Sequence, residues 1–275
     1  MKPGPLARDR HALYEAAVQG VEQDLNFYQR VYRELRGRPF HWLREGFCGT
    51  AQLSCAWVMR GAERRAWGVD RDPEPLAWAR RVHFPAMREA ARRVTLVRRD
   101  VRTHRGPRVD VVCAMNFSYW VFHRRRELVG YFSGVRRSLR RGGLFFANAF
   151  GGNEAMLPLV ERRRVAGTNA PDGTLLPSFA YEWEQRSFDA ITHRLRCDIH
   201  FRFRDGTSMR RAFHYDWRMW SLPEIRDALA EAGFRRSEVF METIDSRTGS
   251  GTGVYRRRGH YENHEGWLAL LVGVS

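Results

Sequence analysis

The first 150 residues alternate between short apolar runs and longer segments in which apolar residues recur at helical spacing. Such runs predict strands, and spacings of three and four residues predict amphipathic helices. Strands are predicted at 40–43, 65–70, 94–97, 109–114 and 144–150. The run 109–114 is apolar except at Asp110, which is typical of a parallel strand buried on both faces. The alternation indicates an α/β fold.

Residues 11–36 predict one long helix, because apolar residues recur at helical spacing from Leu13 to Leu35. Gly37 and Pro39 follow, a pattern common at helix C-termini. Residues 1–10 predict a frayed tail.

The pattern changes after residue 152. Residues 154–165 predict a helix and 167–177 a loop. From Phe179 the apolar period becomes two, which predicts three antiparallel strands. These strands are predicted at 179–187, 194–204 and 207–217. Asp205-Gly206, between the last two, is a strong hairpin signal.

The C-terminal part returns to helix and strand. Ser221 and Glu224 form a capping-box pattern, which predicts a helix that ends at Gly233. Strands are predicted at 234–242 and 266–274, with a polar, glycine-rich loop at 245–259 between them.

The stretch after the first strand carries the strongest chemical signal. Glu45 closes the strand, and Gly46 and Gly49 permit a tight turn, because glycine adopts positive φ without steric cost. Residues 51–59 predict a helix whose N-terminal amides favour an anionic group. Asp70 ends the next strand, where a carboxylate can accept both hydroxyls of a ribose. The arrangement predicts a nucleoside site, but the Gly-x-Gly-x-x-Gly spacing of dinucleotide-binding folds is absent.

These motifs resemble those of the class I S-adenosylmethionine-dependent methyltransferases. The first motif of that family often reads acid-x-x-Cys-Gly-Thr-Gly/Ala, which residues 45–51 follow, and residues 68–70 are similar to its second motif. The resemblance implies S-adenosylmethionine as cofactor, with Asp100 accepting the adenine amine and Val101 donating its amide to the adenine ring. The cofactor-binding residues expected on this basis are Glu45, Gly46, Cys48, Gly49, Thr50, Asp70, Asp100, Val101 and Asn116.

The resemblance also implies a doubly wound, mostly parallel, seven-stranded sheet with an antiparallel insert. We expect an N-terminal helical lid at 1–38, a cofactor-binding core at 39–152, and a substrate-covering insert at 153–220. Residues 221–275 are expected to complete the core sheet.

The strand at 109–114 brings the following residues to the edge that carries the glycine turn, because ligands of open α/β sheets bind at the carboxyl ends of strands. A general base is needed only if the acceptor's proton has to leave early, and His123 is one further candidate. The expected catalytic residues are Asn116, Tyr119 and His214. The expected substrate-binding residues are Tyr28, Ser118, Tyr119, Tyr181, His200, His214 and Asp216. No metal-ligand spacing is present, so no metal is expected.

Composition adds a strong positive charge. The formal net charge is +16, and Lys2 is the only lysine among 47 basic residues. This skew indicates a coding bias towards arginine, and the arginines are scattered along the chain. The Asn/Asp-Pro-Pro-aromatic motif of amino-directed nucleic-acid methyltransferases is absent from residues 116–119, which read Asn-Phe-Ser-Tyr. A nucleic-acid partner is therefore not favoured.

We expect weak, non-specific binding of RNA and duplex DNA at physiological salt, with a Kd of about 10⁻⁴–10⁻⁶ M, because scattered charge supplies only phosphate attraction. A salt titration of binding by fluorescence anisotropy checks this. Sequence-selective nanomolar binding, or methyl transfer to bulk RNA, would contradict it.

The chain of 275 residues is long enough to bury a large core. No apolar run reaches the length of a membrane span, and the N-terminus lacks a signal-peptide core. The four cysteines have no Cys-x-x-Cys spacing, so a reduced, cytoplasmic protein is expected. The sequence does not determine the oligomeric state.

Methyl transfer to oxygen or nitrogen of a small molecule is the predicted function. Two alternatives stay open: methylation of RNA or DNA, and a non-catalytic binding protein that kept the fold.

Overall fold

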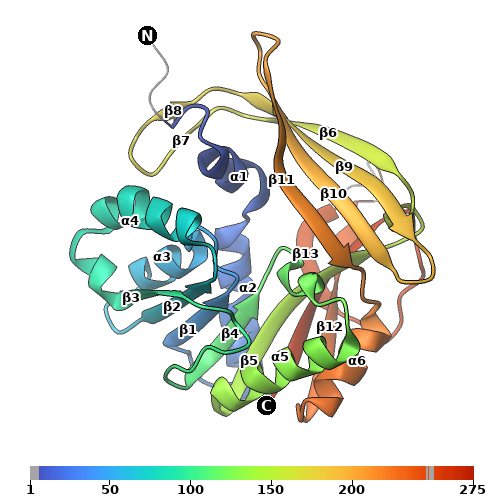
Figure 1. The fold of residues 1–275 in the computed structure, drawn as a ribbon. Coiled ribbons are helices and arrows are strands. Elements are labelled where there is room, and N and C mark those ends of the chain that lie inside the picture. The colour runs from blue at the N-terminus through green and yellow to red at the C-terminus, as the bar shows by residue number, and fades with distance from the viewer. Residues whose placement is uncertain (1–5, 246, 248–250) are drawn as a thin grey trace.

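The computed structural model describes residues 6–245, 247 and 251–275 (Figure 1). Its centre is a sheet with the strand order β13-β12-β14-β5-β4-β1-β2-β3. The strands are β1 (Trp42–Gly46), β2 (Arg65–Asp70), β3 (Val94–Arg98), β4 (Val109–Ala114), β5 (Leu139–Gly151), β12 (Arg236–Ile244), β13 (Gly251–Arg257) and β14 (Trp267–Val274). Strands β1 to β5 pair in parallel, and β12, β13 and β14 are joined by antiparallel pairing. The predicted α/β fold class is confirmed.

The predicted count of seven strands is one too few for the described part of the chain. Residues 251–257, which were predicted as loop, form β13 and pair with β12 along the sheet edge. The pairing satisfies backbone groups of β12 that would otherwise face solvent. The predicted loop also includes residues 246 and 248–250, which lie outside the described residues.

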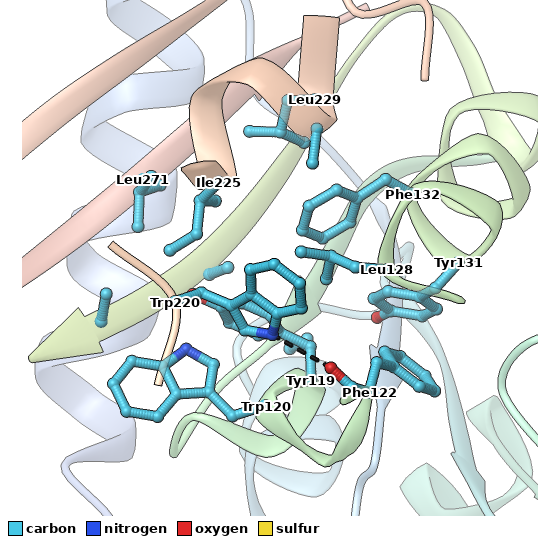
Figure 2. Close-up of a cluster of buried hydrophobic side chains, with 14 of the residues drawn as sticks. Tyr119, Trp120, Phe122, Leu128, Tyr131, Phe132, Trp220, Ile225, Leu229 and Leu271 are labelled. Carbon is cyan, nitrogen blue, oxygen red and sulfur yellow. Dashed lines mark hydrogen bonds between the residues drawn. The ribbon is translucent and has the colours of Figure 1, made fainter. Parts of the chain in front are cut away.

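Helices cover both faces of the sheet (Figure 1). One face carries α2 (Val21–Arg36), α3 (Gln52–Met59) and α4 (Pro73–Met87), and the other carries α5 (Arg125–Ser138) and α6 (Leu222–Glu231). On the second face, aromatic side chains from the β4–α5 segment pack against α5, α6 and Trp220 (Figure 2). The two apolar clusters explain why the parallel strands are buried on both faces.

The long N-terminal helix predicted at 11–36 is two helices. α1 (Arg10–Val18) begins after Asp9, whose carboxylate accepts the backbone amides of His11 and Ala12. The backbone is extended at Gln19, and α2 starts after Gly20. The break allows α1 to pack on the insert while α2 packs on the main sheet.

The insert is a four-stranded antiparallel sheet with the order β11-β10-β9-β6. Its strands are β6 (Leu159–Val165), β9 (Phe179–Asp189), β10 (Arg194–Arg202) and β11 (Ser208–Arg218). A small ribbon of β7 (Thr168–Asn169) and β8 (Leu175–Leu176) lies between β6 and β9 in sequence. The predicted helix at 154–165 is wrong, because 159–165 pair with β9 as an edge strand. Figure 1 shows this sheet arching over α1.

All four cysteines are free and buried. Among the helices of the described residues, none combines the length and apolarity that a membrane crossing requires.

Candidate active site

The glycine turn after β1 is held by a carboxylate of the neighbouring strand. Gly49 donates its amide to Asp70 Oδ2 over 2.9 Å, and the Asp72 amide binds Asp70 Oδ1 at the same distance. Gly49 has a φ of 51°, and Phe47 and Ala51 adopt φ values of 56° and 54° although they carry side chains. Non-glycine residues are uncommon at such angles and are often found at functional sites.

Gly46 and Cys48 shape the turn through packing. A Cβ on Gly46 would lie 3.2 Å from the Tyr131 hydroxyl, so glycine admits this side chain of α5. The Cys48 thiol is buried, which raises its pKa well above the ordinary value. Cys48 therefore acts as a small apolar residue beneath the turn.

Glu45 connects β1 to α3 through hydrogen bonds with Ser54. Its Oε2 accepts the Ser54 amide at 3.0 Å and the Ser54 hydroxyl at 2.6 Å. The side chain is only 8% exposed, and burial raises the pKa of its carboxyl to about 8. The carboxyl group is thus buried at the edge of the sheet, close to the start of α3.

Asp100 follows β3 and is bound by an arginine two residues later. Arg102 donates to Asp100 Oδ2 from Nη2 at 2.7 Å and from Nε at 3.2 Å. These hydrogen bonds lower the pKa of Asp100, so its carboxylate is ionised. Val101, next along the chain, is half-buried. The exocyclic amine of an adenine would therefore bind the Asp100 carboxylate alongside the Arg102 guanidinium group.

Helix α1 contacts one end of the turn, at Thr50. Thr50 is 3% exposed, and its hydroxyl donates to Glu15 Oε1. The same oxygen lies 2.8 Å from His83 Nε2 of α4. Sequence reasoning missed Glu15 and His83, because they lie 35 and 33 positions from Thr50 and belong to no recognisable motif.

The loop after β4 brings Asn116 to the strand edge. Asn116 and Phe117 have φ values of 53° and 56°, and the Phe117 amide donates to Asn148 Oδ1 of β5 at 3.0 Å. The Ser118 hydroxyl donates to the Met115 carbonyl at 2.7 Å. Asn116 and Phe117 are both half-buried. The left-handed backbone turns the chain sharply where parallel strands end.

Tyr119 does not fit the acceptor role predicted from the sequence. Its side chain is 0% exposed, and its hydroxyl donates to the Asn148 carbonyl at 2.9 Å. Burial raises its pKa well above the ordinary range. Figure 2 shows Tyr119 within the cluster beneath Trp220, so the residue supports the loop from below.

The inner face of the insert is aromatic and reaches this loop. Tyr215 stacks on Trp217 with ring centroids 4.3 Å apart, and Trp183 lies 6.1 Å from Trp217. The Trp217 ring is 6.0 Å from the ring of Phe117. Tyr181 also lies on this face, in the cluster that includes α1. Trp183, Tyr215 and Phe117 are half-buried, and Trp183 and Tyr215 also pack against the cluster that includes α1.

His200, His214 and Asp216 lie on the opposite, outer face of the insert, because neighbouring residues of a strand point to opposite sides. His214 pairs with Asp198 across β10 and β11, and Asp216 pairs with Arg194. His200 Nε2 lies 2.9 Å from Glu184 Oε2, and its Nδ1 accepts the Arg211 amide at 3.0 Å. The prediction that these three residues contact substrate does not fit this placement.

Glu184, Asp198 and His200 form a group whose ligand atoms lie within 4.8 Å of one another. Asp198 is also within ion-pair distance of Arg186 and Arg211. Because protein cations and hydrogen bonds already occupy the group, it forms part of an ion-pair network on the outer face.

Tyr28 of α2 is completely buried and stacks on Phe146 of β5, with ring centroids 4.4 Å apart. Its hydroxyl lies beside the Cys113 thiol, a weak hydrogen-bond partner, and has no stronger one among the described residues. The prediction that Tyr28 contacts substrate does not fit its complete burial in this core cluster.

Residues 47–147 match a family described as a methyltransferase domain. This match and the fold confirm the class predicted from the sequence, an S-adenosylmethionine-dependent methyltransferase. No curated protein matches the chain.

Solved structures share the fold over almost the whole chain. The sugar N-methyltransferase KedS8 from Streptoalloteichus is 18% identical, with a TM-score of 0.64 over 100% of this chain and 95% of that one. CalS10, an amino pentose methyltransferase from Micromonospora echinaspora, is 16% identical, with a TM-score of 0.64 over 94% and 95%. An S-adenosylmethionine-dependent methyltransferase from Clostridium acetobutylicum is 16% identical, with a TM-score of 0.62 over 95% and 96%.

The residues around the turn fit S-adenosylmethionine. Each Asp70 oxygen accepts one amide and keeps a lone pair for a ribose hydroxyl. A Cβ placed on Gly49 would meet nothing within 4 Å, so the space above the turn is open. Tyr28 and Gln52 each hold a buried polar atom without a strong partner among the described residues. Such atoms are suited to the polar groups of a ligand.

Proposed function

We propose that this enzyme transfers the methyl group of S-adenosylmethionine to an amine nitrogen of a polar small molecule of the amino-sugar type. The observation that carries the proposal is the aromatic inner face of the insert, which meets Phe117 at the end of β4. Aromatic rings bind the apolar faces of sugar-like rings and are common in small-molecule pockets. The sugar and amino pentose substrates named for KedS8 and CalS10 support the same acceptor class.

The cofactor roles follow the strand ends. We assign the ribose hydroxyls to Asp70 and the adenine to Asp100 and the Val101 amide. Gly46, Cys48 and Gly49 form the turn that permits close backbone approach. Thr50 and Glu45 line the methionine end, together with the loop at Asn116.

Nitrogen is favoured over oxygen as the attacking atom. A hydroxyl acceptor needs a base, but the Tyr119 hydroxyl is bonded to the Asn148 carbonyl and His214 faces outward beside Asp198. A neutral amine attacks with its own lone pair and loses its extra proton to water afterwards. Bound S-adenosylmethionine supplies the activated methyl group, so the chain's residues have to align the acceptor and exclude water.

In this mechanism Asn116 positions the amine. Its side-chain carbonyl can accept one N–H of the acceptor and direct the lone pair towards the methyl position. Trp183 and Tyr215 hold the acceptor ring. The half-buried state of all three residues leaves atoms free for these contacts.

We expect Trp183→Ala to lower kcat/KM for an amino-sugar acceptor by about 10–150-fold, because burial of one large apolar side chain contributes about 1.5–3 kcal/mol. Cofactor affinity should stay unchanged, since Trp183 lies on the acceptor side. Initial-rate kinetics and calorimetry measure the two quantities. Phe188→Ala, at the hairpin end of the same strand, is the matched control and should leave both unchanged.

The acceptor class is tested with pairs of nucleotide-linked or free sugars that differ only in an amino or hydroxyl group. Mass spectrometry should show one added methyl group on the amino member. Methylation of the hydroxyl member alone would show that oxygen is the acceptor.

A further inference from the structure

Asp24, in the first turn of α2, lies at the ligand-binding edge of the sheet. Helix α2 runs antiparallel to β1: the ring of Tyr32 is 5.2 Å from that of Phe40, just before β1. One turn earlier, Tyr28 reaches Phe146 and Cys113 in the upper halves of β5 and β4. Asp24 precedes Tyr28 by four residues, so it lies on the same helix face about 6 Å further towards the C-terminal strand ends.

Among the acids at this edge, Asp24 is the one whose carboxylate lacks a donor within the described residues. Glu45 accepts two hydrogen bonds from Ser54, and Asp70 accepts the amides of Gly49 and Asp72. Asp24 is half-buried, and burial alone raises the pKa of its carboxyl to about 7. Its carboxylate is therefore desolvated but unpaired, which is unfavourable unless a ligand compensates.

The negative charges around Asp24 favour binding of a cation. Burial is the main cause of the raised pKa of Glu45, and the negative charges of Asp70 and Asp24 add to it, so both carboxylates lie near Glu45. Burial raises the pKa of Tyr28 and of Tyr255 from β13, and the negative charge of Asp24 adds to both shifts. The Tyr28 hydroxyl beside it is buried, and among the described residues its polar neighbour is the Cys113 thiol, a weak hydrogen-bond partner. A cationic ligand with hydrogen-bond donors would satisfy both the unpaired charge and the free oxygen atoms.

We propose that the Asp24 carboxylate binds the ammonium group of the methionine part of S-adenosylmethionine. An ammonium offers three N–H donors, whereas the sulfonium is surrounded by carbon and donates no hydrogen bond. The inference rests on the cofactor of the proposed function and does not depend on the acceptor. Under this proposal, α2 contributes to cofactor binding together with the loops at the strand ends.

The test compares three ligands by calorimetry at pH 8. S-adenosylmethionine and S-adenosylhomocysteine both carry the ammonium, and 5′-methylthioadenosine lacks the amino-acid part. Asp24→Asn should weaken binding of the first two by tenfold or more and leave the third within twofold of wild type. Glu22→Gln, which removes an exposed charge from the same helical turn, is the matched control and should change none of them.

Other outcomes overturn the assignment. A loss confined to S-adenosylmethionine would point to the sulfonium, and an equal loss for all three ligands would mean general damage to the pocket. Unchanged affinities would exclude a contact. Thermal melting checks the fold of Asp24→Asn, and Asp24→Ser provides a second variant. Wild-type protein that binds no S-adenosylmethionine would instead contradict the proposed function itself.

Discussion

Replacing Trp220 with alanine is expected to lower the free energy of unfolding by about 3–5 kcal/mol, the usual cost of truncating a buried tryptophan. The ring is 1% exposed and lies at the centre of the cluster in Figure 2. Its Nε1 donates to the Phe122 carbonyl at 3.1 Å, and the Arg218 guanidinium lies 3.8 Å from the ring centroid. The substitution therefore leaves a cavity and an unpaired carbonyl beneath the acceptor loop. Urea denaturation measures the change.

Trp220 contributes both buried apolar volume and a hydrogen bond, and a second variant and a control separate the two. Trp220→Phe keeps much of the apolar volume but removes the hydrogen bond, so a smaller loss is expected. Val121→Ala, at an exposed residue of the same loop, should change stability by no more than about 0.5 kcal/mol. Equal stabilities of wild type and Trp220→Ala would show that the cluster does not support the fold as described.

Replacing Asp70 with alanine is expected to cost about 1.5–3 kcal/mol of S-adenosylmethionine affinity, the range for hydrogen bonds to charged groups. The carboxylate has two tasks in this structure. It holds the turn through the Gly49 amide, and it presents its remaining lone pairs where the ribose hydroxyls are expected. Calorimetry should show a Kd raised by about 10–150-fold.

Asp72→Ala is the control for this measurement. Asp72 caps α4 by accepting the Glu74 amide at 2.9 Å, so its loss should lower stability by about 1 kcal/mol while affinity is kept. Equal affinity of wild type and Asp70→Ala would remove the ribose assignment. Tight binding of NAD in place of S-adenosylmethionine would contradict the cofactor as well.

Much of the core could be predicted because its signals are local. The strand, glycine turn and helix all lie within residues 42–59, so their signal comes from neighbours in the sequence. Asp70 at the next strand end follows from the same repeat of strand and helix. Such patterns can be predicted without knowing which distant residues are in contact. In the structure the Gly49 amide lies 2.9 Å from Asp70 Oδ2.

The insert shows where local patterns stop being sufficient. Alternation already implied that His214 and Tyr215 point to opposite sides. It did not determine which side covers the site, because that depends on where α1 and the Phe117 loop pack. Residues 159–165 contain three successive arginines and carry no clear strand pattern. They form a strand because they pair with β9.

The sequence by itself determined the α/β class, the glycine turn and the acids that end the first three strands, because backbone geometry and strand order depend on neighbouring residues. Tertiary structure decided that Glu15 of α1 covers Thr50, that Tyr119 is enclosed in the core, and that Asp24 is half-buried without a hydrogen-bond donor among the described residues. These outcomes depend on which surfaces are buried against each other. Burial is a property of the assembled fold. It decides which polar side chains have partners within the protein and which are left available to a ligand.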